Sequence, residues 1–82
     1  MPTVLRFGAF RMIIYLNDHR PPHVHVRGRG SQAIFNLNCP AGPPELRAQR
    51  GLASAEVGAI KRVLSVNLQT LCEAWERIHG DA

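Results

Sequence analysis

Residues 23–38 read HVHVRGRGSQAIFNLN and contain two runs in which apolar and polar residues alternate. In the first run, the valines face one side, and the opposite side carries His23, His25 and Arg27. The second run, residues 32–38, continues the alternation after the glycine-containing turn at 28–31. Alternation with a period of two, interrupted by a glycine turn, is typical of a β-hairpin. The segment therefore predicts a hairpin with one apolar face and one basic, histidine-bearing face.

Shorter alternating runs on both sides of the hairpin predict further strands. Residues 4–7 form a short candidate strand closed by Gly8, and residues 10–16 alternate more clearly. After a proline-rich loop, residues 45–47 can add a short edge strand. These runs predict an antiparallel sheet of three to five strands within residues 1–47.

The period changes to a helical one in the last third of the chain. From about residue 54 to residue 79, apolar side chains recur every three or four positions. Ser54 is a candidate N-cap, and a kink is expected near residues 65–67. The sequence thus predicts a single α+β domain over residues 1–82, with the sheet packed against one long C-terminal helix.

Composition limits the class of protein and of partner. The chain has 82 residues, 45% of them hydrophobic, which is enough for one small globular core. Its formal net charge is +4, and nine of the ten basic residues are arginine. Arginine forms planar, bidentate contacts with phosphate and carboxylate groups, so this bias favours an anionic partner. A GC-rich genome also enriches arginine, and we give the two explanations equal weight.

The two cysteines and the N-terminus bear on the cellular compartment. Cys39 and Cys72 can form one bridge, but they lie in no C-x-x-C pair and make no disulfide framework. No apolar run approaches the length of a membrane span, and the start of the chain lacks the features of a signal peptide. We therefore expect a cytoplasmic protein with reduced thiols, no membrane partner, and Cys72 packed in the core.

The stretch NDHRPPHVHVR, residues 17–27, holds three of the four histidines and is the candidate functional segment. Residues two apart on a strand project to the same side, so His23 and His25 can share one metal ion. His19 is a possible third ligand from the loop, and Asp18 can supply a carboxylate. Such a set suits zinc or another transition metal. The neighbouring arginines oppose a cation, so we expect no cofactor and keep the metal as an alternative.

A second hypothesis is acid–base chemistry on RNA without a metal. Imidazole titrates near neutral pH, so His23 and His25 are candidate catalytic residues of a ribonuclease. Arginine can hold the phosphate and tyrosine can stack on a base. The candidate anion-binding residues are Arg11, Tyr15, Arg20, Arg27 and Arg29. Binding of RNA or DNA without cleavage is an equal alternative to the ribonuclease hypothesis.

A third hypothesis assigns the segment no chemistry. The prolines and the residues around them can simply build a rigid turn, and an exposed strand edge can pair with another chain. The protein would then be a module that binds a small partner protein.

Several motifs together resemble one known family. They are the opening residues 1–8, the segment HRPPHVHV at 19–26, the Arg50–Gly51–Leu52 step and the late Trp75. These motifs resemble the small bacterial family named domain of unknown function 4160 (DUF4160), over nearly the whole chain. The resemblance implies a compact α+β protein that is often encoded beside a small partner of the DUF2442 family. That arrangement is similar to a toxin–antitoxin pair.

We therefore predict a cytoplasmic bacterial α+β protein of toxin–antitoxin type that contacts RNA through its His/Arg sheet face. Whether it is an enzyme stays open, with a metal-independent ribonuclease as the candidate. The expected partners are a small cognate protein and RNA, with a homodimer as a further possibility.

Overall fold

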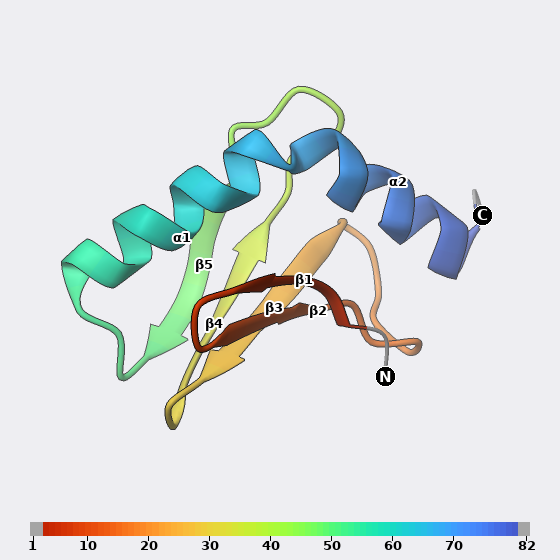
Figure 1. Cartoon of the computed structure of the whole chain (residues 1–82). Coiled ribbons are helices and arrows are strands. Elements are labelled where there is room, and N and C mark those ends of the chain that lie inside the picture. Colours follow the sequence, from red (N-terminus) through yellow and green to blue (C-terminus); the bar gives the residue numbers. More distant parts are fainter. Residues whose placement is uncertain (1–2, 81–82) are drawn as a thin grey trace.

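The computed structural model describes residues 3–80, which form a five-stranded antiparallel sheet followed by two helices (Figure 1). The strands lie in the sheet in their order along the chain, and each pairs with the next. The elements are β1 (Thr3–Phe7), β2 (Phe10–Ile13), β3 (His23–Gly28), β4 (Ser31–Asn36), β5 (Glu45–Arg50), α1 (Ser54–Val66) and α2 (Leu68–His79). The predicted α+β class and antiparallel sheet are confirmed.

The predicted hairpin is formed by β3 and β4, which pair from His23↔Asn36 to Gly28↔Ser31. Its turn has two central residues, Arg29 and Gly30, and both have positive φ (49° and 76°). Positive φ at both positions is the feature of a type I′ turn, whose twist matches that of the paired strands. The close turn sets the register, so every alternating side chain of the hairpin has a defined face.

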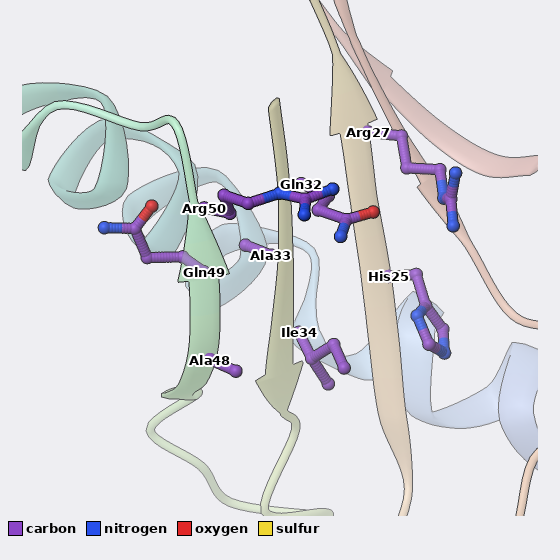
Figure 2. Close-up of a pocket in the computed structure, with 8 residues that line it drawn as sticks. All are labelled: His25, Arg27, Gln32, Ala33, Ile34, Ala48, Gln49 and Arg50. Atoms are coloured by element: carbon purple, nitrogen blue, oxygen red, sulfur yellow. The ribbon is translucent and has the colours of Figure 1, made fainter. Parts of the chain in front are cut away.

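Both helices lie against one face of the sheet and leave the other face without a helix (Figure 1). Figure 2 views the sheet from this second face, which we call the open face. Strand alternation assigns most apolar side chains to the helix-covered face and most basic side chains to the open face. The open face is therefore where an external ligand can reach the sheet.

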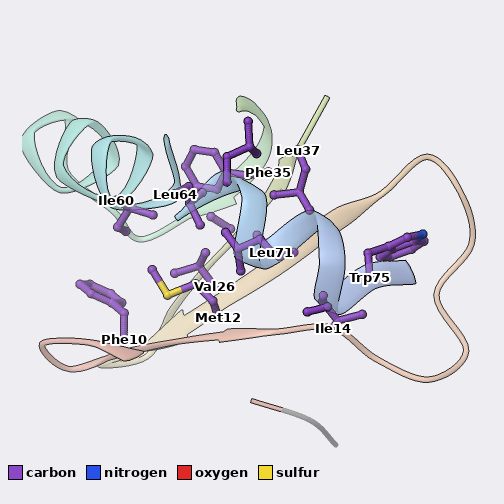
Figure 3. Packing of buried hydrophobic residues seen from close by; sticks show 14 of the residues in the cluster. Phe10, Met12, Ile14, Val26, Phe35, Leu37, Ile60, Leu64, Leu71 and Trp75 are labelled. Atoms are coloured by element: carbon purple, nitrogen blue, oxygen red, sulfur yellow. The ribbon is translucent and has the colours of Figure 1, made fainter. Parts of the chain in front are cut away.

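The core lies between the sheet and the helices (Figure 3). Its fully buried members include side chains of β2, β3 and β4 and of both helices: Met12, Val24, Val26, Phe35, Ile60, Leu64, Leu71 and Trp75. Each buried side chain of this size contributes roughly 1.5–3 kcal/mol relative to its exposed state. The three- and four-residue spacing in the sequence thus correctly identified the helix faces that pack on the sheet.

The prediction of one long helix over residues 54–79 is wrong in detail, because the helix is interrupted at Asn67. Asn67 has φ −106° and ψ 18°, outside helical values, and separates α1 from α2. Its side-chain amide donates to the carbonyl of Val63 at 2.8 Å, and the hydroxyl of Ser65 donates to that of Lys61 at 2.9 Å. Side chains that bond the carbonyl four residues earlier compete with the helical ladder and bend it. The break falls where the sequence predicts a kink.

The start of α1 also differs from the prediction. Ser54 is the first helical residue, and the N-cap is Ala53, which has no side-chain acceptor. Glu56 instead accepts a hydrogen bond from the backbone N–H of Ala53 at 3.0 Å. The carboxylate therefore takes over part of the capping and also complements the helix dipole. No helix within residues 3–80 is long and apolar enough to cross a membrane.

The expectation of reduced thiols is wrong in this structure, because Cys39 and Cys72 form a disulfide with a Cα–Cα distance of 5.9 Å. The bond ties the loop after β4 to the first half of α2. Two cysteines 33 positions apart carry no sequence signal for pairing; the packing of α2 across the sheet brings them within bonding distance.

Candidate functional site

A row of polar side chains, four of them arginine, crosses all five strands of the open face. The register pairs Arg6 with Arg11, Arg11 with Arg27, Arg27 with Gln32, and Gln32 with Arg50. Directly paired residues of antiparallel strands present their side chains on the same face. We call this set, Arg6, Arg11, Arg27, Gln32 and Arg50, the arginine row.

The four arginines of the row are exposed, and none of their side chains has a hydrogen bond or ion pair to another of residues 3–80. Like charges that face each other on neighbouring strands destabilise a sheet. Arg11 stands between two such neighbours, Arg6 and Arg27. The arrangement therefore costs stability in the free protein, and an anion placed over the row would remove that cost.

The open face is hollowed over β3, β4 and β5 beside the arginine row (Figure 2). The depression has a volume of about 310 Å³. Its lining includes His25 and Ile34 as well as Arg27, Gln32 and Arg50 of the row. In Figure 2, the Arg50 side chain extends across β4 toward Gln32. Cationic, amide and apolar groups thus meet in one shallow surface.

Next to the row, Asp18, His23 and His25 gather their side chains into one cluster, which we call the Asp–His cluster. The Nε2 atoms of His25 and His23 lie 3.2 Å and 3.5 Å from the same Asp18 oxygen, Oδ1. The other oxygen, Oδ2, accepts the backbone N–H of Tyr15 at 2.9 Å, which fixes the carboxylate. The side chains are largely buried, with exposures of 12%, 8% and 21% for Asp18, His23 and His25.

The hydrogen bonds of His23 determine which of its ring nitrogens carries a proton. Its Nδ1 lies 2.8 Å from the carbonyl oxygen of Pro21. A carbonyl can only accept, so Nδ1 carries the hydrogen and donates it. In the neutral ring Nε2 then has a lone pair and no hydrogen, and this lone pair lies close to the Asp18 carboxylate. Two acceptors therefore face each other in a nearly buried position.

Aromatic rings surround the cluster and join it to α2. The Tyr15 ring meets His25 edge to face at 4.7 Å between centroids, and Trp75 lies 5.3 Å from His23. His79, at the end of α2, stacks on Trp75 at 4.1 Å and donates from Nε2 to the Tyr15 carbonyl at 3.1 Å. The segment between β2 and β3 is thus fixed to the last turn of the helix.

The structure brings some of the predicted site residues together and separates others. Arg11, Arg27 and His25 lie on adjacent strands of the open face, and the ring of Tyr15 contacts that of His25. Arg20 instead pairs with Glu76 of α2 at 3.0 Å, and Arg29 pairs with Glu56 of α1. His19 is exposed and lies outside the Asp–His cluster. His23 is 6% exposed, so its ring is an interior group.

Sequence reasoning missed Arg6 and gave little weight to Arg50, although both extend the row to the edges of the sheet. Only the strand register aligns them with Arg11 and Arg27. β5 contains a bulge, because Ile34 pairs with Ala48 whereas the next residue, Phe35, pairs with Leu46. The bulge shifts the alternation along β5, so the sequence does not show which residue of β5 is aligned with the row. The alternation within single strands was visible, whereas the alignment between strands was not.

Comparison with known proteins supports the family resemblance. No curated protein and no solved structure matches this chain. The sequence model of a domain of unknown function, DUF4160, matches residues 9–76, which include the Asp–His cluster and three of the four arginines of the row. The chain therefore belongs to the DUF4160 family.

Proposed function

We propose that this protein binds single-stranded RNA across the open face of its sheet. The observation that carries the proposal is the arginine row, four exposed arginines without an anionic partner among the described residues. Neighbouring strands are about 4.8 Å apart, so a row across five strands spans about 19 Å. This length corresponds to five or six stacked nucleotides at about 3.4 Å each. A single phosphate would occupy only a small part of the row.

The other groups of the open face suit the bases and sugars of RNA. Gln32 lies within the row, and its amide both donates and accepts, so it can bond a base edge or a 2′-hydroxyl. Tyr15 and Ile34 add apolar surface near the row on which a base can lie. A basic track with aromatic and amide groups beside it is typical of surfaces that bind single strands.

We propose binding rather than cleavage. A general acid or base has to reach the proton that it transfers. Both ring nitrogens of His23 face groups inside the protein, Pro21 and Asp18, and the residue is 6% exposed. His25 lines the depression, but its Nε2 is directed to Asp18. The predicted roles of His23 and His25 as ribonuclease residues therefore have less support than an RNA-binding role for the arginines.

A small cognate partner protein remains the second proposal, in the toxin–antitoxin setting that the family resemblance implies. Its natural docking place is the outer edge of β5, whose six residues are all exposed. That edge carries Glu45, Arg47 and Arg50 and contains a bulge, and such features protect edges against strand pairing. We therefore rank RNA first.

A protein that binds RNA is expected in the cytoplasm. Reductants in that compartment open many disulfides.

Removing charge from the row tests the proposal. The probe is a fluorescent ten-nucleotide single-stranded RNA, titrated with protein at several salt concentrations. If all four arginines contact phosphate, log K should fall with log salt with a slope of about −2.8, from about −0.7 per contact. The double variant Arg11→Gln/Arg27→Gln should bind more weakly, with a slope smaller in magnitude by about 1.4.

The matched control is Arg62→Gln/Arg77→Gln, which removes the same charge from exposed positions of α1 and α2. It should bind RNA like the parent apart from a small general loss. Equal weakening by both double variants would mean that net charge alone attracts RNA, and the proposal would fail. The same titration with single-stranded DNA measures the contribution of the 2′-hydroxyl.

A further inference from the structure

We propose that the Asp–His cluster binds one transition-metal ion, with Zn²⁺ as the ion that best fits it. Two imidazole nitrogens and one carboxylate oxygen from Asp18, His23 and His25 lie within 4.8 Å of one another. Two histidines and one carboxylate are a recurrent ligand set for zinc and for non-haem iron. The inference does not depend on RNA binding, because none of the three ligands belongs to the arginine row.

The two distances from Asp18 to the histidines match a metal site. Zinc binds nitrogen and carboxylate oxygen at about 2.0–2.2 Å, which sets the ligand atoms of a tetrahedral site about 3.4 Å apart. The two distances from Asp18 Oδ1, 3.2 Å to His25 and 3.5 Å to His23, are close to that value. Asp18 and each histidine therefore need little movement to share an ion, whereas the two histidine nitrogens, which lie within 4.8 Å of one another, can move closer together on binding.

The hydrogen bonds around the cluster are those that support metal ligands. Metal-binding histidines usually donate their other ring N–H to a carbonyl or carboxylate. His23 does so, with Nδ1 donating to Pro21, and this leaves the Nε2 lone pair directed into the cluster. The Tyr15 amide in turn holds the Asp18 carboxylate through Oδ2 and leaves Oδ1 toward the histidines. Two of the three ligands are thus oriented before any ion arrives.

The nearly buried position of His23 is itself an argument for a cation. A neutral His23 sets its Nε2 lone pair 3.5 Å from the Asp18 oxygen, and two acceptors repel each other. A metal ion between them converts this repulsion into two coordinate bonds. A second proton on His23 could also relieve it, and this is the competing explanation that the experiment has to separate.

A further buried polar atom lies beside the cluster. Asn36 pairs directly with His23 across the hairpin, so their side chains are on the same side of the sheet. The side-chain oxygen of Asn36 is buried and has no hydrogen-bond partner within residues 3–80. Three protein ligands leave one position of a tetrahedral ion for water, and such a water could donate to this oxygen. The partner of Asn36 would be this water and not the metal ion itself. A proton on Asp18 or on either histidine also gives the Asn36 oxygen no partner.

The test measures zinc binding by protein without a histidine tag, treated with a chelator and then titrated calorimetrically with Zn²⁺. We expect one ion per chain and a higher melting temperature, and the hydrogen of the neutral His25 ring moves from Nε2 to Nδ1 when Nε2 binds the ion. His25→Ala, the least buried ligand position, should weaken binding at least 100-fold. Asp18→Asn should do the same. His19→Ala, which changes an exposed histidine outside the cluster, should bind zinc like the parent.

Two outcomes of the zinc titration would overturn the proposal. No stoichiometric binding by the folded parent would overturn the proposal and leave a doubly protonated His23 as the explanation of the cluster. Equal loss in His19→Ala and His25→Ala would also overturn it, because the ion would then lie elsewhere. Cobalt substitution provides an independent check: Co²⁺ should bind with the intense visible absorption of a tetrahedral ion in the parent and not in His25→Ala. RNA titration of the zinc-free protein keeps this test separate from that of the arginine row.

Discussion

Asp18 holds the segment between β2 and β3 through both of its carboxylate oxygens. One carboxylate oxygen accepts the Tyr15 amide, and the other lies against two histidine rings. A carboxylate that accepts a backbone N–H in a partly buried place makes a charge-assisted bond, which is stronger than a neutral one. Asp18 therefore links the loop to β3 and orients His23 and His25 at the same time.

Replacing Asp18 by Ala should lower the free energy of unfolding by about 2 kcal/mol, because hydrogen bonds to charged groups contribute about 1.5–3 kcal/mol. Urea denaturation in the presence of a chelator measures this loss without any effect of metal. His19→Ala is the control, since His19 is exposed and should change stability little. A loss below about 0.5 kcal/mol would show that the Asp18 contacts do not hold the loop.

At the scale of the strand, the sheet carries more positive charge on its open face than its own stability favours. Arg11 faces an arginine on each side, on β1 and on β3. Residues selected only for folding would avoid this arrangement, because like charges opposite each other destabilise paired strands. Stability and ligand binding therefore make opposite demands on the same residue.

The variant Arg11→Gln should be slightly more stable than the parent, by a few tenths of a kcal/mol, and should bind RNA more weakly. The gain in stability should shrink as salt is added, because exposed charges are screened. Thermal or urea unfolding at low and high salt measures it, and Arg62→Gln on α1 gives the comparison. A loss of stability in Arg11→Gln would show that this arginine has a structural partner.

The elements themselves were largely predictable, and their ends were not. Alternation located the strands, and the three- and four-residue spacing located the helical region, because these patterns reflect which face is buried. At the break, the side chains of Asn67 and Ser65 donate to the carbonyls of Val63 and Lys61. These bonds compete with the backbone hydrogen bonds of the helix, although the residues on both sides of the break favour a helix. Such local competition is decided by fractions of a kcal/mol, and a periodic pattern does not resolve it.

At the scale of the whole molecule, a core on one side and charge on the other define the fold. The described residues bury one core between the helices and the sheet. The arginine row lies on the opposite surface of the sheet. A domain of this size has a free energy of unfolding of only about 4–12 kcal/mol, from about 0.05–0.15 kcal/mol per residue. A single covalent link between distant elements is therefore a large contribution.

Reduction of the Cys39–Cys72 disulfide should lower the free energy of unfolding by about 4 kcal/mol, since the bond closes a loop of 33 positions. Urea denaturation with and without reductant measures the change. The double variant Cys39→Ser/Cys72→Ser should resemble the reduced parent and should not respond to reductant. Identical midpoints for oxidised and reduced parent protein would show that the core alone holds α2 in place.

The amino-acid sequence by itself determined the fold class, the hairpin, the core faces of strands and helices, and the segment in which the site lies. These features follow from periodicity, turn residues and composition, which act over a few neighbouring residues. Only the tertiary structure decided that Asp18 rather than His19 joins His23 and His25, that four arginines align across five strands, and that Cys39 meets Cys72. Each of these depends on strand register, or on how a loop or helix packs against the sheet, and therefore on contacts between segments whose relative placement no local pattern encodes.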